Sequence, residues 1–251
     1  MAGLAFAPVV PPGAEQALPA NLNAHFAFAN VAWANPAYAE WYRGHKGLVV
    51  DCPIYEGKQP LTPQQLAEVS LFLEPRFLII PDVRFSSHAT LARAEEYLKI
   101  LPKHQRNTGV LQGASTRGVR ECCIALLDMG LVSVAVPKDL QPTLGLSRSA
   151  LLSHLVQEGV LPPSVQIHLL GANWPYSDER TAGAELPMVL SVDTAEPANA
   201  ALAGLRLDTC APPARPEDWF GRANDLLTAR GQRLLIGNIE VLRQRIGDHH
   251  E

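Results

Sequence analysis

The chain has 251 residues, of which 47% are hydrophobic and 18% are charged, and its formal net charge is −4. This length suits one large domain with a single core and is typical of a (β/α)8 barrel. The negative charge argues against broad, non-specific nucleic-acid binding, although a local basic groove remains compatible with it. The sequence contains no long apolar run and no charged leader followed by an apolar segment, so we expect a soluble cytoplasmic protein without a membrane span.

Residues 1–24 are rich in alanine and proline and predict an arm on the surface. Residues 25–210 then alternate between apolar runs and helical segments roughly eight times, which is typical of a parallel barrel. Residues 211–251 predict helices that pack on this barrel. The expected strands are 25–28, 48–50, 77–80, 108–112, 131–136, 165–170, 188–193 and a weak last strand at 205–208.

We therefore predict an α/β fold, a single-domain (β/α)8 barrel of the TIM type. An open, doubly wound parallel sheet is the alternative, because alternation of strands and helices does not distinguish the two. Helix-start signals support the expected boundaries. Thr62 and Gln65 predict a capping box, and Pro63 between them suits the first position of a helix. Ser87, Thr116 and Ser147 can each begin a helix.

The cysteines do not predict a metal site. Cys52, Cys122, Cys123 and Cys210 form no CxxC pair, so the usual spacing of a zinc site is absent. The adjacent pair at 122–123 falls in a predicted helix and indicates core packing. We expect no bound metal and no cofactor, and a reducing compartment suits this use of cysteine.

Several expected strands end in a polar side chain. An apolar run leads directly into Asp51, and the same arrangement precedes Asp82, Asp193 and, with an amide in place of an acid, Gln112. In a parallel barrel the carboxyl ends of all strands meet at one mouth, so these groups would converge there. Each acid alone could be a helix cap or a turn residue. Paired carboxylates in one pocket could instead divide nucleophilic attack and proton transfer between them.

At these positions the sequence resembles the tRNA-guanine transglycosylase superfamily. These enzymes are (β/α)8 barrels that exchange guanine for a 7-deazaguanine base. The chain is shorter than the tRNA enzymes and lacks the cysteines of their zinc subdomain, so it looks closer to the small, often phage-encoded branch that modifies DNA. The motifs that carry the resemblance are Asp51-Cys52-Pro53-Ile54-Tyr55, Pro81-Asp82, Leu111-Gln112-Gly113, Leu169-Leu170-Gly171 and Val192-Asp193-Thr194, within residues 47–205.

The resemblance implies a role for each matching residue. Asp193 matches the nucleophile that attacks C1′ and expels guanine, and Asp51 matches its acid/base partner. Tyr55 matches an aromatic residue that stacks on the base, although Pro53 and Ile54 stand where the family usually has small residues. The remaining expected base-binding residues are Asp82, Gln112, Gly113, Ala135, Val136, Leu170 and Gly171.

The implied partners are guanine-containing DNA, a 7-deazaguanine base and, as a further option, a helper protein. A base inside a duplex must be flipped out or already single-stranded before its sugar is accessible. The candidate phosphate contacts are Arg43, His45, Lys46, Lys103, Arg106, Arg117 and Arg120. Two alternatives stay open: a catalytically altered relative that binds nucleic acid or a partner enzyme, and a transglycosylase that acts on tRNA or a free nucleoside.

Overall fold

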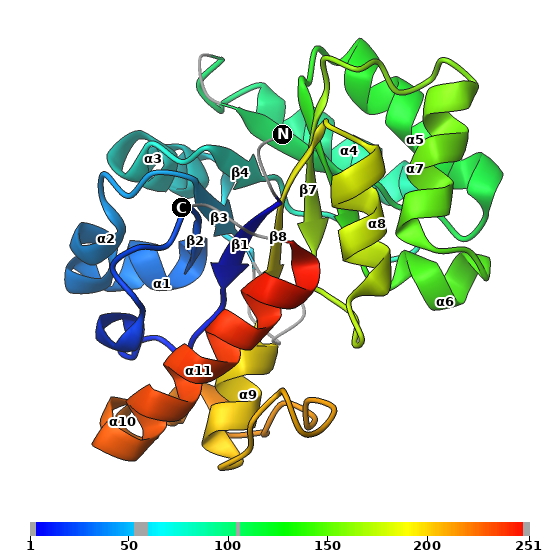
Figure 1. Cartoon of the computed structure of the whole chain (residues 1–251). Helices are drawn as coiled ribbons and strands as arrows, with labels where there is room; N and C mark the ends of the chain where they lie inside the picture. The colour runs from blue at the N-terminus through cyan, green and yellow to red at the C-terminus, as the bar shows by residue number, and fades with distance from the viewer. Residues whose placement is uncertain (1–3, 53–59, 104–105, 248–251) are drawn as a thin grey trace.

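The computed structural model describes residues 4–52, 60–103 and 106–247, and it contains one sheet of eight parallel strands. The strand order is β1-β8-β7-β6-β5-β4-β3-β2, and the two edge strands β1 and β2 contact each other, so the sheet forms a nearly closed barrel (Figure 1). The predicted (β/α)8 barrel is confirmed. The strands are β1 (Ala5–Pro8), β2 (His25–Phe28), β3 (Leu48–Asp51), β4 (Phe77–Ile79), β5 (Asn107–Val110), β6 (Ser133–Pro137), β7 (Gln166–Leu170) and β8 (Val189–Thr194).

The apolar character of the strands follows from their burial on both faces. Leu48, Val49 and Val50 of β3 are all fully buried, as are Val134 to Val136 of β6. Such strands need no polar alternation, because side chains on one face fill the barrel and those on the other pack under helices.

The helices are α1 (Ala29–Ala34), α2 (Pro36–Tyr42), α3 (Pro63–Leu73), α4 (Ser87–Leu98), α5 (Thr116–Asp128), α6 (Leu140–Leu144), α7 (Arg148–Gln157), α8 (Ser177–Glu185), α9 (Glu196–Leu202), α10 (Ala223–Leu227) and α11 (Ala229–Ile246), with 3-10 turns η1 (Glu15–Ala17) and η2 (Trp219–Gly221).

Side-chain caps define where several helices begin. Thr62 and Gln65 form the predicted capping box of α3, in which the Gln65 side chain accepts from the Thr62 N–H at 2.9 Å. Ser147 caps α7 as predicted. Helices α4 and α5 begin at Ser87 and Thr116 as predicted, and the residues that cap them are Ser86 and Ser115. Each serine oxygen accepts a hydrogen bond from a first-turn N–H that has no partner within its own helix.

The first strand lies within the segment that the sequence predicted to be a surface arm, so that expectation was wrong. Ala5–Pro8 pairs in parallel with residues 191–194 of β8 and supplies the eighth barrel strand. The predicted last strand at 205–208 is instead a turn, in which the Leu207 N–H donates to the Asn238 side chain. The run from Leu4 to Val10 is apolar, but it is short and lies in a segment rich in alanine and proline, so it was not recognised as a strand; its pairing with β8 reveals it.

The segment after β8 lies at the end of the barrel toward which the strands point. Figure 1 shows α9, α10 and the connecting chain between them at this end, where the arrowheads of β1 and β8 point. Helix α11 packs along α9 and also contacts α8. In the described part of the chain, no helix is both long and apolar enough to cross a membrane.

Candidate active site

A cavity of about 480 Å³ opens at the carboxyl ends of the strands. Its described wall carries five carboxylates, from Asp51, Asp82, Asp139, Asp193 and Glu196, and two cations, from Lys138 and Arg215. This volume falls within the range of small-molecule sites, about 300–1,000 Å³. Apolar and neutral residues complete the wall: Val9, Phe26, Phe28, Cys52, Pro137, Leu170, Gly171, Thr194, Ala195, Asn199, Pro212, Pro213 and Ala214.

Three strands bring the predicted acids together. Asp51 is the last residue of β3, Asp82 follows β4, and Asp193 lies near the end of β8, opposite Ala7 of β1. All three line the same cavity, so the expected convergence at one mouth is confirmed. Burial differs between them, since Asp82 and Asp193 are buried whereas Asp51 is half-buried.

Asp193 is held by two contacts from the neighbouring strand β7 and the turn that follows it. Its Oδ1 accepts hydrogen bonds from the backbone N–H of Gly171 at 3.1 Å and contacts His168 Nε2 at 3.0 Å. Gly171 has φ 71°, and a Cβ there would approach the Lys138 side chain to 2.8 Å. Glycine is therefore required both for this turn and for Lys138 to cross it. These two contacts fix the orientation of the Asp193 carboxylate, which lines the cavity.

His168 is a site residue that the sequence analysis missed. It is fully buried in β7, and its Nδ1 lies 2.8 Å from Ser191 Oγ while its Nε2 contacts Asp193. The three side chains form one chain of hydrogen bonds beneath the cavity. A histidine in the otherwise apolar run Ile167–Leu170 was the available signal, because a buried imidazole needs polar partners.

The expected role of Asp193 as a nucleophile predicts that loss of the His168 contact slows turnover. His168→Phe keeps a ring of similar size but removes the partner of Asp193, so turnover should fall by up to about a hundredfold through misplacement of the carboxylate. His168→Gln, whose amide can donate from a similar position, should recover part of this loss. Steady-state kinetics of both variants, with melting temperatures as a control, would check this. Equal activity of His168→Phe and wild type would contradict it.

Gln112 holds Asp82 instead of facing the cavity. Its amide nitrogen donates to Asp82 Oδ2, and its amide oxygen accepts from the Phe85 N–H at 2.9 Å. Gln112 is not among the cavity-lining residues. The sequence-based expectation that it hydrogen-bonds a bound base directly therefore needs correction, since both ends of its amide are already engaged within the protein. It orients the carboxylate that faces the cavity.

The other expected base-binding residues divide into two groups. Leu170 and Gly171 line the cavity as predicted. Gly113, Ala135 and Val136 do not, because Gly113 packs against the start of α5 and the Val136 carbonyl accepts from Arg148 at 3.1 Å. Tyr55, with its neighbours Pro53 and Ile54, lies outside the described residues.

Most of the predicted phosphate contacts lie away from the cavity. Arg43, His45 and Lys46 precede β3, and Lys103 and Arg106 precede β5, so all five lie at the amino ends of the strands, opposite the cavity. Arg106 accordingly bonds Gln166, the first residue of β7. The placement of these residues near the mouth was wrong, because a connection that enters a parallel strand must lie at its amino end.

Arg117 and Arg120 lie on helix α5 and pair with acids of the outer surface. Arg117 forms an exposed ion pair with Glu121 at 2.8 Å, and Arg120 pairs with Glu158 at 2.9 Å. Neither residue lines the cavity. The cavity cations, Lys138 and Arg215, were not among the sequence-based candidates.

Glu196 is a further acid of the wall. Tyr176 donates a hydrogen bond to its Oε2. Burial raises the pKa of Glu196 above its ordinary value of 4.5, and this effect outweighs the Tyr176 hydrogen bond and the Lys138 charge, which both lower it. The first residue of a helix is a common position for an acid, so the sequence alone offered no reason to single it out.

The raised pKa of Glu196 predicts a pH-dependent stability cost. Its protonated form is favoured in the folded state, so its contribution is fully present below the unfolded pKa and is lost as pH rises from about 4.5 through the folded pKa. Glu196→Gln should therefore gain stability relative to wild type as the pH rises from 4 to 7. Urea unfolding at both pH values would measure this, with exposed Glu240→Gln as the control. A pH-independent difference would contradict it.

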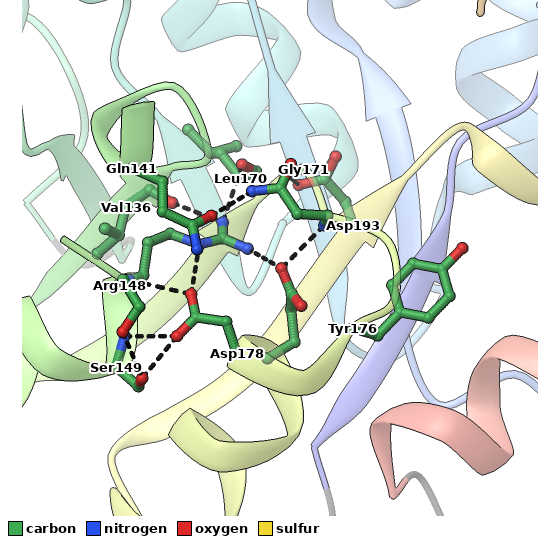
Figure 2. A network of polar contacts seen from close by, with 12 residues as sticks. Val136, Gln141, Arg148, Ser149, Leu170, Gly171, Tyr176, Asp178 and Asp193 are labelled. Carbon is green, nitrogen blue, oxygen red and sulfur yellow. Dashed lines mark hydrogen bonds and ion pairs between the residues drawn. The ribbon is translucent and has the colours of Figure 1, made fainter. Parts of the chain in front are cut away.

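A buried ion-pair network supports this side of the mouth (Figure 2). Arg148 and Glu179 are both fully buried and pair with each other, and Arg148 Nη1 also donates to the carbonyls of Val136 and Leu170 at 3.1 and 3.2 Å. Glu179 Oε1 additionally accepts from the Asn173 N–H at 2.9 Å. The network thus ties the ends of β6 and β7 to α7 and α8, and it fixes the turn that presents the Gly171 N–H to Asp193.

Within residues 4–52, 60–103 and 106–247, no group of three or more His, Cys, Asp or Glu side chains is arranged to hold a metal ion. No family model matches the chain, and no curated protein matches it.

Proposed function

We propose that the protein is a base-exchange transglycosylase that replaces guanine in DNA with a 7-deazaguanine base. The observation that carries this proposal is the convergence of Asp51, Asp82 and Asp193 on one cavity at the carboxyl ends of the strands. These are the three acids whose order in the chain resembles the transglycosylase motifs. The choice of DNA as the substrate follows the resemblance of these motifs to the branch of the superfamily that modifies DNA.

The reaction proceeds in two displacements at C1′ of the sugar. Asp193 attacks C1′, the bond from C1′ to the guanine nitrogen breaks, and a carboxylate–sugar ester forms while Asp51 delivers a proton to the leaving base. The incoming base then loses a proton to Asp51 and displaces Asp193, which restores the carboxylate. Retention at C1′ follows, because the configuration is inverted twice.

The environment of each acid suits its role. Asp193 lines the cavity, and its contacts with Gly171 and His168 hold its carboxylate in one orientation, as a nucleophile requires. Asp51 is half-buried, which allows its proton to exchange as bases enter and leave. Asp82 can accept hydrogen bonds from the N–H groups of the guanine edge, and Gln112 orients it for this purpose.

Incorporation of radiolabelled guanine into nucleic acid would test the proposal. Single-stranded DNA, duplex DNA, unmodified tRNA and free deoxyguanosine would be compared as acceptors. We expect exchange into DNA, with single strands ahead of duplex because the target base is already unstacked. Exchange into tRNA alone would show that the substrate is tRNA and not DNA. Failure with every acceptor, with or without a cell extract as a source of a helper protein, would overturn the proposal.

A further inference from the structure

The C-terminal segment of the chain is rich in arginine. Residues 203–247 carry seven arginines and five acids, against a net charge of −4 for the whole chain. The segment follows α9 and lies at the end of the barrel toward which the strands point (Figure 1). The arginines are Arg206, Arg215, Arg222, Arg230, Arg233, Arg243 and Arg245.

Three of these arginines line one hollow. Arg206, Arg230 and Arg233 surround a space of about 310 Å³ beside Leu234 and Gly237. Arg206 pairs with Asp208 at 2.6 Å, whereas among the described residues no carboxylate lies within ion-pair distance of Arg230 or Arg233. Like charges gathered around one space repel each other, and a bound anion would relieve that repulsion.

The start of α11 strengthens the positive field of this hollow. Arg230 and Arg233 lie near its amino end, and its first turn contains no acid. A helix amino terminus carries a partial positive charge that acids usually offset, so arginines there add to the dipole. Helix N-termini and guanidinium groups are both common binding groups for phosphate.

A continuous stretch links the hollow to the cavity. Residues 206–215 run from the hollow to the cavity wall, where Arg215 lies with Lys138 among the lining residues. The Arg215 guanidinium rests 4.2 Å from the centroid of the buried Trp219 ring and 5.0 Å from that of Phe220. Stacking on two rings holds this cation at the mouth in a defined position.

We propose that Arg206, Arg230 and Arg233, together with Arg215 and Lys138 at the mouth, form the surface that binds the sugar–phosphate backbone of the nucleic-acid substrate. The identity of the partner rests on the proposed function, but the surface is defined by its own geometry. Its cations extend from the cavity wall to a separate hollow, an arrangement that suits a polyanion running across the mouth better than a single phosphate. The backbone then passes the cavity with one nucleotide inside it.

The salt dependence of binding tests this surface. Fluorescence anisotropy would measure the affinity for a guanine-containing single-stranded DNA oligonucleotide over a range of KCl concentrations. The plot of log K against log salt has a negative slope, and each lost phosphate contact makes this slope shallower by about 0.7 for single strands. The triple variant Arg206→Gln/Arg230→Gln/Arg233→Gln should therefore have a slope that is shallower than that of wild type by about two. The matched control, Arg43→Gln/Lys46→Gln/Lys103→Gln, removes the same charge from the opposite end and should leave the slope unchanged.

Each outcome decides for or against the surface. Three results would overturn the proposed surface. The control variant could show a shallower slope than wild type, all three proteins could show equal slopes, or wild type could fail to bind nucleic acid. Asp193→Asn separates this test from the proposed chemistry, because that variant should keep the wild-type slope while forming no covalent adduct. If binding follows the expected pattern but wild type exchanges no base, the proposed function fails and the surface stands. If wild type exchanges the base but the triple variant keeps the wild-type slope, the proposed function stands and the proposed surface fails.

Discussion

Asp193→Asn is expected to abolish the covalent protein–DNA adduct while leaving the fold intact. The asparagine keeps the shape of the side chain and can still contact His168 and the Gly171 N–H, but it lacks the charged oxygen that would attack C1′. The residue lies in the cavity wall and not in the apolar core, so its replacement should cost little stability. Denaturing gels of the protein incubated with labelled DNA would show the adduct in wild type and none in the variant.

Asp51→Asn should behave differently from Asp193→Asn. It retains the nucleophile and can still form an adduct, but exchange should slow by about a hundredfold or more, as expected when a positioned proton-transfer group is lost. Asp128→Asn, on the exposed end of α5, is the matched control and should match wild type. Adduct formation by Asp193→Asn would show that the assigned roles are wrong.

Arg148→Met is expected to lower the free energy of unfolding by about 3–5 kcal/mol, because it leaves a fully buried Glu179 carboxylate without its charged partner. It also removes the donor to the Val136 and Leu170 carbonyls at the ends of β6 and β7. The double variant Arg148→Met/Glu179→Leu should recover part of the loss, since it removes both buried charges and fills the space with apolar groups.

Urea unfolding of the single and double variants would measure these changes. Arg117→Met is the matched control, because its ion pair with Glu121 is exposed and exposed pairs contribute about 0–1 kcal/mol. If Arg148→Met costs no more than Arg117→Met, the buried network does not stabilise this side of the barrel. The single variant Glu179→Leu would be measured as well. If the double variant loses more unfolding free energy than the two single variants lose together, the account of an unpaired buried charge is contradicted.

The sequence by itself determined the barrel and the convergence of its acids. Seven of the predicted strands match described strands, because strands buried on both faces are mostly apolar and stand out as short apolar runs. Asp51, Asp82 and Asp193 could be placed at one mouth because each follows such a run, and parallel strands share a direction. These signals are local in the chain, and one residue of uncertainty at a boundary does not change them.

Only the tertiary structure decided which polar groups serve the cavity. β1 is recognisable through its pairing with β8, and His168 gains its role from Ser191 and Asp193 on the neighbouring strand. Gln112 was expected to contact a base but is engaged by Asp82 and Phe85. The predicted cations were chosen by charge, yet several precede strands and so lie at the opposite end. Hydrogen bonds and charge clusters form between segments distant in the chain, so their partners depend on how the barrel closes and not on local sequence.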